Sequence, residues 1–186
     1  MNIMIVGVGG QGTLLASRIL GKVAIKEGYD VKVSEVHGMS QRGGSVVTYV
    51  KYGYKVYSPI IDRGEADLIL AFEMLEAMRA LPYLKKGGKM IANTQKMNPM
   101  PVITGAMEYP ENIEEKLSAK INLQAVDALS LAEKAGTIKA VNVVLIGLLA
   151  KSMDVDKNVW IDVIKETVPE KFLDVNIKAF ELGYEL

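Results

Sequence analysis

The chain opens with a pattern of apolar and amphipathic segments that predicts a strand, a helix and a second strand. Residues 2–6 are predicted to form a buried strand, because the four residues after Asn2 are an unbroken apolar run with β-branched side chains. Residues 13–27 carry apolar side chains at helical spacing, and Gly28 follows where a helix would end. Residues 30–36 alternate between apolar and polar positions, as a half-exposed strand does. The opening is therefore predicted to be a βαβ unit with a right-handed crossover.

The alternation continues and then gives way to helices. Further strands are predicted at residues 45–52, 68–72, 89–92 and 121–126, and helices at 73–81, 110–119, 128–135, 140–153, 157–166 and 169–182. We expect Gly87 and Gly88 to form the turn before the strand at 89–92. Two prolines are expected to keep residues 98–101 irregular.

This order of elements indicates an α/β fold with a single doubly wound, Rossmann-like and mostly parallel sheet. Helices are expected on both faces of the sheet, and the C-terminal third is expected to be helical. Neither a repeat nor a low-complexity tract nor a long linker divides the sequence, and 186 residues suit one domain. Residues 1–186 are therefore expected to form a single domain.

The composition excludes several kinds of site. Lys plus Arg and Asp plus Glu number 22 each, so the field needed to bind nucleic acid is not expected. The chain has no cysteine, which excludes disulfides, a cysteine nucleophile and thiolate ligands for an iron–sulfur cluster. With His37 as the single histidine, a histidine-rich zinc site is not expected either. The apolar residues 141–150 are too few to span a bilayer, and the start lacks a signal-peptide pattern, so we expect a cytoplasmic protein.

Four glycines follow the first predicted strand and precede the first predicted helix. Gly7 would allow a tight turn, Gly9 a close approach of the backbone to a ligand, and Gly12 close packing of helix on strand. The unpaired amides of a first helical turn and the helix dipole favour an anion at this place. Glycines can also serve only to turn the chain, and on this motif alone the two interpretations are equally supported.

A second polar loop runs from His37 to Gly44. Gly43 and Gly44 can place consecutive N–H groups in a concave nest, and Arg42 could add a bidentate contact to a phosphate or carboxylate. A glycine-rich surface connection is the alternative. The sheet order places this loop beside Gly9 at the carboxyl edge of the strands, where open α/β sheets bind ligands, so we favour a function. His37 has no evident carboxylate partner in the sequence.

Other polar residues at predicted strand ends have a structural explanation beside a functional one. Glu35 lies where dinucleotide-binding folds place the acid that binds ribose, which favours NAD, but the chain leaves little length for a catalytic region. Glu73 is expected to stabilise a helix dipole, although it could contact a ligand. Asn93 and Thr94 could cap, bind or do both. Lys85 and its neighbour Lys86 are expected in a solvated turn, or against a nucleotide phosphate.

Taken together, these motifs resemble the γ-type component of 2-oxoacid:ferredoxin oxidoreductases. The resemblance rests on the segments 7–12, 35–47 and 66–73 and on Asn93 and Thr94, and it extends over essentially the whole chain. It implies an enzyme complex that converts a 2-oxoacid and coenzyme A to an acyl-CoA, releases carbon dioxide and reduces ferredoxin. It also implies a large α subunit that carries thiamine diphosphate, magnesium and the iron–sulfur clusters. Relatives that use pyruvate, 2-oxoisovalerate or 2-oxoglutarate share the architecture, so the 2-oxoacid stays open.

The resemblance implies a subunit that holds no catalytic residue, no metal and no cofactor by itself, and that is inactive alone. It is expected to complete the assembly and to form part of the wall of the active site or of the entrance for coenzyme A. The residues expected to face the partner or coenzyme A are Gly9, Gly10, Gln11, Gly12, Ser40, Gln41, Arg42, Gly43 and Gly44. Two alternatives remain, a stand-alone NAD(P)-dependent enzyme with Glu35 on the ribose, and a regulatory module that binds a nucleotide through Arg42.

Overall fold

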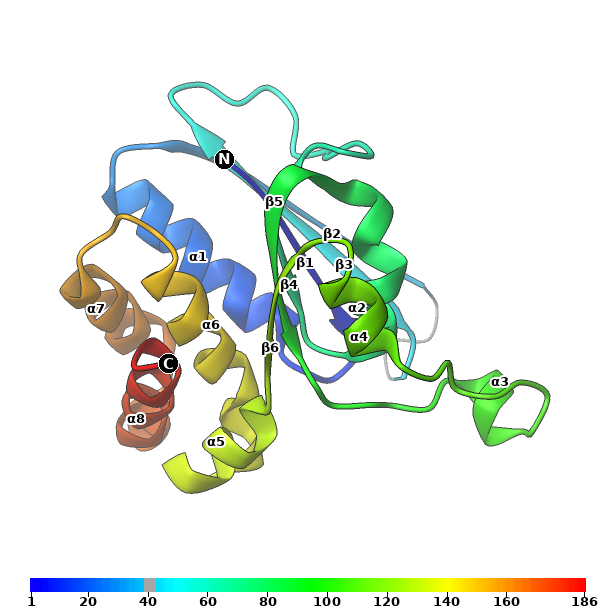
Figure 1. Cartoon of the computed structure of the whole chain (residues 1–186). Helices are drawn as coiled ribbons and strands as arrows, with labels where there is room; N and C mark the ends of the chain where they lie inside the picture. Colours follow the sequence, from blue (N-terminus) through cyan, green and yellow to red (C-terminus); the bar gives the residue numbers. More distant parts are fainter. Residues whose placement is uncertain (39–42) are drawn as a thin grey trace.

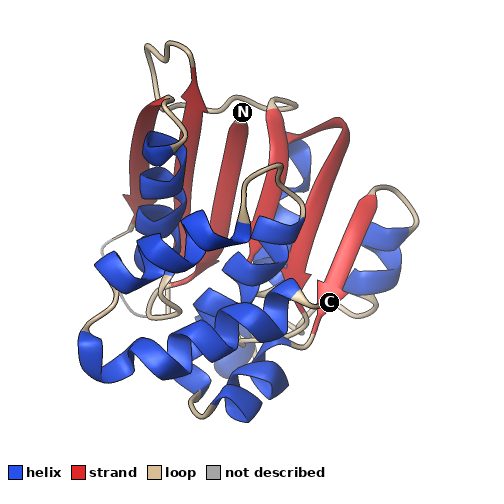
Figure 2. Cartoon of the chain, turned by 90° about the vertical axis from the view of Figure 1, so that its left-hand side faces the viewer, coloured by secondary structure: helices blue, strands red, loops and turns tan. Residues whose placement is uncertain are grey.

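A computed structural model describes residues 1–38 and 43–186, and within them six strands form one sheet. The sheet order is β2-β3-β1-β4-β5-β6. The strands are β1 (Asn2–Val8), β2 (Asp30–His37), β3 (Ser45–Gly53), β4 (Ala66–Ala71), β5 (Leu84–Asn93) and β6 (Asn122–Val126). Figure 2 shows the sheet in red with the helices against it.

Helices follow most of the strands and fill the end of the chain. The α-helices are α1 (Thr13–Lys26), α2 (Met74–Ala80), α3 (Met100–Ile103), α4 (Ile113–Ser118), α5 (Ala128–Ala135), α6 (Val141–Lys151), α7 (Lys157–Thr167) and α8 (Leu173–Tyr184). Short 3-10 turns are η1 (Leu81–Tyr83), η2 (Ile138–Ala140) and η3 (Glu170–Phe172). The expected helical C-terminal third is therefore present.

The sheet is mixed, with a parallel half and an antiparallel half. β1, β4, β5 and β6 pair in parallel, while β3 pairs antiparallel with both β1 and β2. β2 thus runs parallel to β1, as the predicted βαβ unit requires, but β3 lies between them. The predicted fold class, a mostly parallel doubly wound sheet, is confirmed, and the inserted β3 separates the end of β2 from the glycine loop by one strand.

The central strands are buried on both faces, which explains their unbroken apolar runs. In β1, Ile3 and Ile5 point into one core while Met4 and Val6 point into the other, because successive side chains alternate across a strand. The first core lies beneath α1 and the C-terminal helices α5 to α8, and the second lies beneath α2 and α4. Figure 1 shows these two groups of helices on opposite sides of the sheet.

Helix α6 is buried around nearly its whole circumference because α8 packs directly against it. Ten of its residues, Val141 to Ala150, are buried. A Cβ built on Gly147 would lie 2.2 Å from the backbone oxygen of Phe180, and one on Gly183 would lie 2.0 Å from that of Val144. The two glycines therefore allow the helix backbones to touch.

Three local predictions were wrong. Gly87 and Gly88 lie inside β5, where the register with β4 shifts, so they form an irregularity within the strand and not a turn before it. Residues 98–101 are not wholly irregular, because α3 begins at Met100 with Pro101 in its first turn, where proline is tolerated. Pro169 precedes the turn η3 and is not part of a helical turn.

Candidate functional site

The glycine loop connects the carboxyl end of β1 to the start of α1. Gly10 has φ +104° and Gly12 has φ +84°, which is the left-handed region that glycine adopts without strain. Gly12 is also the N-cap of α1. The reversal from strand to helix is thus made by Gly10 and Gly12.

Two of the glycines act differently from the prediction. Gly7 lies within β1, and a Cβ there would come within 2.9 Å of both Gln11 Oε1 and Phe72 Cβ, so it serves close packing and not a turn. A Cβ on Gly12 would lie 2.5 Å from Nδ2 of Asn142 in α6. Gly12 therefore permits a close contact between helices, where helix-on-strand packing was expected.

The glycine loop and the second loop lie side by side, as the sheet order predicts. The N–H of Gly9 donates to the carbonyl of Gly44 at 2.8 Å, and the N–H of Gly43 donates to the carbonyl of Gly9 at 3.3 Å. These bonds continue the β1–β3 ladder and occupy the Gly9 amide. The expected site residues Ser40, Gln41 and Arg42 lie outside the described residues.

The side chain of Gln11 ties the glycine loop to the neighbouring strands. Its Oε1 accepts from the N–H of Val8 at 2.8 Å, and its Nε2 donates to the carbonyl of Phe72 at 3.0 Å and to Oε1 of Gln95 at 3.4 Å. These bonds use both N–H donors of the amide group and one acceptor position of its oxygen. Gln11 therefore fixes the shape of the loop.

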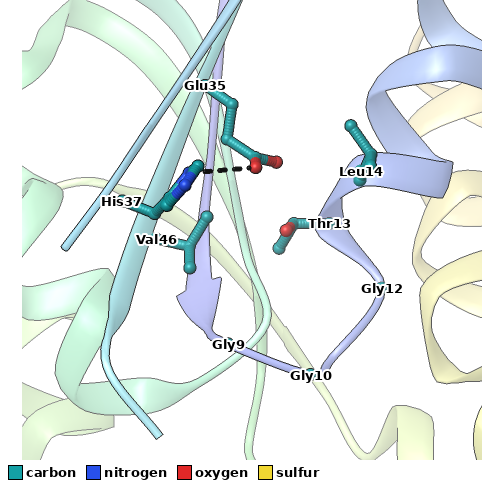
Figure 3. A pocket seen from close by; sticks show the side chains of 8 residues that line it. All are labelled: Gly9, Gly10, Gly12, Thr13, Leu14, Glu35, His37 and Val46. Carbon is teal, nitrogen blue, oxygen red and sulfur yellow. Dashed lines mark ion pairs between the residues drawn. The ribbon is translucent and has the colours of Figure 1, made fainter. Parts of the chain in front are cut away.

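A cavity of about 420 Å³ opens beside the first turn of α1, and we call it the α1 pocket. Figure 3 shows that residues of the glycine loop and of α1 form one side and residues of β2 and β3 the other. The lining residues are Gly9, Gly10, Gly12, Thr13, Leu14, Glu35, His37 and Val46.

His37 has a carboxylate partner that sequence reasoning missed. Its Nδ1 lies 3.3 Å from Oε1 of Glu35, two residues earlier on β2. Residues i and i+2 of a strand share a face, so their spacing was the available signal. The pair puts a carboxylate and an imidazole on the wall opposite α1.

A second cavity, of about 350 Å³, lies beside Gly43 and Gly44 and contains two buried carboxylates. Glu73, 1% exposed, is the N-cap of α2 and accepts from the N–H of Glu76 at 2.9 Å. Glu76, which sequence reasoning did not single out, accepts from the hydroxyl of Ser45 at 2.6 Å and pairs with Arg79. Both carboxylates are thus held by structural partners, and Glu73 stabilises its helix as predicted.

A third cavity, of about 480 Å³, lies across the glycine loop from the α1 pocket. Glycine-loop residues 9–12 line it together with Gln95, Met97, Ile138 and Lys139. Lys139 and Ile138 are both exposed. On this side of the loop, a cationic side chain and an apolar side chain are therefore both exposed in the described chain.

The polar residues noted at other strand ends have structural partners. Asn93, at the end of β5, is fully buried, where its Oδ1 accepts from the N–H of Ala128 at 3.1 Å and its Nδ2 donates to the carbonyl of Phe72 at 3.2 Å, so it fixes the start of α5. Lys85 pairs with Asp67 at 3.0 Å, and Asp67 also accepts from the N–H of Asn2. Lys85 therefore lies at the opposite end of the sheet, where β1 begins.

In the described part of the chain, no group of three or more carboxylate or histidine side chains could hold a metal ion. Among the described residues, each helix is too short or too polar to cross a membrane.

Comparisons with known proteins cover the whole chain. The protein-family model described as pyruvate ferredoxin/flavodoxin oxidoreductase matches residues 2–186. Indolepyruvate oxidoreductase subunit IorB of Thermococcus kodakarensis is 46% identical over 190 residues, which cover 98% of this chain and 93% of that protein. The protein of the same name from Pyrococcus horikoshii is also 46% identical, with the same two coverages.

More distant proteins are similar to the chain in sequence or in fold. The pyruvate/ketoisovalerate oxidoreductases common subunit gamma of Thermococcus kodakarensis is 29% identical, over 96% of this chain and 92% of that protein. Among solved structures, the pyruvate oxidoreductase subunit PORC of Thermotoga maritima superimposes with a TM-score of 0.77 at 20% identity. That alignment covers 100% of this chain and 95% of the other.

Proposed function

The chain belongs to the pyruvate ferredoxin/flavodoxin oxidoreductase family, and we propose that it is the small subunit of an indolepyruvate:ferredoxin oxidoreductase. The observation that carries this proposal is 46% identity, over 98% of the chain, with a protein named as an indolepyruvate oxidoreductase subunit. The gamma subunit common to pyruvate and ketoisovalerate oxidoreductases is less similar, at 29% identity. The difference favours an aryl pyruvate as the substrate of the complex.

In this proposal the enzyme is the complex, acting in the cytoplasm, and not this chain alone. It converts aryl pyruvates and coenzyme A to aryl-acetyl-CoA, with release of carbon dioxide and reduction of ferredoxin. Thiamine diphosphate, magnesium and the iron–sulfur clusters belong to the large α subunit. The side chains present here agree with that division, because a chain without cysteine offers no thiolate to an iron–sulfur cluster.

We assign the carboxyl edge of the sheet as the face turned toward the large subunit or coenzyme A. The backbone pairing of Gly9 with Gly44 supports this assignment, since it joins the two loops into one surface. In the cavity next to that surface, Lys139 supplies a cation for a phosphate and Ile138 an apolar contact. The residues proposed to face the partner or coenzyme A are Gly9, Gly10, Gln11, Gly12, Ser40, Gln41, Arg42, Gly43 and Gly44.

The contribution of this chain to the reaction is positional. Gln11 holds the glycine loop and Asn93 holds the start of α5, so both parts of the edge are ordered before a partner arrives. Ordering a surface in advance lowers the entropic cost of association. A rigid wall that excludes water would protect a reactive thiamine-bound intermediate from side reactions.

Co-purification with the large subunit tests the proposed partner and the proposed face. We expect the full chain to elute with the co-expressed large subunit in size-exclusion chromatography. Ile138→Asp should weaken this association because Ile138, 59% exposed, lies beside the glycine loop. Ile25→Asp is the matched control, because Ile25 is 62% exposed on α1 and lines none of the three cavities around the loop.

Two results would contradict these assignments. Separate elution of the two wild-type subunits would contradict the proposed partner. Equal effects of Ile138→Asp and Ile25→Asp would contradict the proposed face. The substrate is tested on the purified complex, where kcat/KM for indolepyruvate should exceed the values for pyruvate, 2-oxoisovalerate and 2-oxoglutarate. A higher value for any of these three would reassign the substrate.

A further inference from the structure

The α1 pocket brings together two kinds of group that no single simple ion would satisfy. Hydrogen-bond donors of the glycine loop and α1 form one wall, and the carboxylate of Glu35 faces them from the other (Figure 3). Val46 of β3 lies between these walls, because β3 is inserted between β1 and β2. The pocket therefore has an anion-binding end and a hydroxyl-binding end.

The donor end is the first turn of α1. Within the described residues, the N–H groups of Gly10, Gly12, Thr13 and Leu14 donate to no backbone or side-chain acceptor. The first turn of α1 carries no acidic residue, and no side chain caps it. Such amides together with the helix dipole favour a phosphate group.

Thr13 supplies the independent sign of a ligand. The residue is 6% exposed and lines the pocket, yet in the described chain its hydroxyl makes no hydrogen bond. Its methyl group is turned toward β1, since a Cβ built on Gly7 would lie 3.2 Å from Thr13 Cγ2. Figure 3 shows the side chain directed at the cavity. Among the described residues, Trp160 Nε1 is the one fully enclosed polar side-chain atom without a partner, so the Thr13 hydroxyl is open to the cavity, where a ligand can accept from it.

The acceptor end is the carboxylate of Glu35. One oxygen pairs with His37 at 3.3 Å, and the other lies 3.5 Å from the hydroxyl of Thr48, so each oxygen keeps acceptor capacity on a side chain that lines the pocket. A carboxylate at the end of this strand is the group that binds the hydroxyls of a ribose in dinucleotide-binding folds. It would repel a second phosphate placed at the same end.

We propose that the α1 pocket binds a nucleoside diphosphate whose ribose has free 2′ and 3′ hydroxyls. The diphosphate would accept from the α1 amides and from Thr13, and the ribose hydroxyls would donate to Glu35. The 3′-phosphorylated ribose of coenzyme A is disfavoured by the charge of Glu35. The volume of about 420 Å³ suits such a ligand. The site shares Gly9, Gly10 and Gly12 with the face proposed for the partner or coenzyme A, and Glu35, Thr13 and Leu14 belong to the α1 pocket alone.

Calorimetric titration of the full chain with ADP, NADH, coenzyme A and inorganic pyrophosphate tests the proposal. We expect ADP and NADH to bind with one-to-one stoichiometry and coenzyme A more weakly. Glu35→Gln should weaken ADP about tenfold, because it removes hydrogen bonds to a charged acceptor, and should spare pyrophosphate. Thr13→Val should weaken both ADP and pyrophosphate. Glu166→Gln is the control and should change nothing, since the Glu166 side chain forms an exposed ion pair with Lys26 and does not line the α1 pocket.

A second measurement guards against a variant that fails to fold. Addition of ADP to the isotope-labelled wild-type chain should shift the amide resonances of Gly10, Gly12, Thr13 and Leu14 more than those elsewhere. Absence of ADP binding, or shifts confined to another surface, would overturn the proposal. Binding of coenzyme A as tight as that of ADP, with Glu35→Gln affecting neither, would overturn the assigned role of Glu35.

Discussion

At the scale of single residues, Glu73 shows how one buried carboxylate can organise several elements. It caps α2, and its Oε1 also accepts from the N–H of Met97 at 3.0 Å and from the hydroxyl of Tyr109. Burial and the contact with Glu73 both raise the pKa of Tyr109, which keeps its hydroxyl protonated as a donor. Glu73 thus holds the residues on either side of the segment 98–108, which contains the projecting helix α3 in Figure 1.

Replacing Glu73 should therefore cost stability well beyond the loss of one cap. Glu73→Gln puts an amide donor where three donors converge, and we expect the free energy of unfolding to fall by about 1.5–3 kcal/mol. Urea unfolding measures this change. Glu108→Gln, at an exposed position of the same segment, should stay within about 0.5 kcal/mol of the wild type. Equal losses in the two variants would show that the convergence on Glu73 is energetically unimportant.

Gly10 and Gly12 offer a matched pair in the glycine loop. Both have positive φ, so alanine at either position should destabilise the fold by about 1–2 kcal/mol through backbone strain. Only at Gly12 would the new Cβ also displace Asn142 Nδ2, 2.5 Å away, and break its hydrogen bond to the Gly12 carbonyl, which should add roughly 0.5–1.5 kcal/mol. Denaturant unfolding of both variants provides the comparison, and a Gly10→Ala loss equal to that of Gly12→Ala would argue against this displacement.

Asp127 gives the fold a defined pH dependence. Hydrogen bonds from Ser130 hold the pKa of this helix-capping carboxylate below its usual range. A lowered pKa means that the stabilisation is full at neutral pH and disappears as the pH falls through the folded-state pKa. Asp127→Ala should therefore cost about 1 kcal/mol at pH 7. Its difference from the wild type should shrink below roughly pH 4. A difference that stays constant down to pH 2 would contradict this role.

The sequence predicts the positions of these residues better than it predicts their structural roles. Gly7 and Gly12 were expected to turn the chain and to pack helix on strand, but their partners Phe72 and Asn142 are 65 and 130 residues away. Such contacts depend on how the sheet is assembled. The pairing of Glu35 with His37, by contrast, follows from strand periodicity and could have been predicted.

At the scale of elements, local signals are sufficient where the ends of a helix carry their own caps. The helix predicted at 128–135 is α5, bounded by the Asp127 cap and by Gly136. The strand predicted at 89–92 lies in the second half of a longer β5, which begins at Leu84 because the strand passes through the Gly87–Gly88 irregularity. Pairing with β4 decides this extension, and a local pattern cannot show it.

Alanine substitutions at two helical glycines are expected to have opposite effects on stability, because only one of the glycines lies in the contact of α6 with α8. Gly147→Ala should destabilise the chain by about 3 kcal/mol or more, because the added carbon meets the backbone of α8 and neither helix can move freely. Gly21→Ala in α1 has its nearest neighbour at 3.7 Å, and it should be stabilising by about 0.4–1 kcal/mol. Thermal and urea unfolding distinguish the two. Effects of the same sign would refute the close backbone contact.

At the scale of the whole molecule, the alternation of strands and helices predicted the fold class, and the resemblance of the motifs predicted the family; both are confirmed. The antiparallel β3 between β1 and β2 was not predicted, because the order of strands in a sheet leaves little trace in local periodicity. The insertion has a consequence for ligands. Glu35 and the glycine loop are separated by one strand, and the α1 pocket occupies the space between them.

The central claim is that this chain works only as part of a two-subunit oxidoreductase. The direct test is indolepyruvate- and coenzyme A-dependent reduction of ferredoxin, measured for this chain alone, for the large subunit alone and for the two mixed. We predict turnover by the mixture and none by this chain alone. Turnover by this chain without the large subunit, or a mixture no more active than the large subunit alone, would contradict the claim.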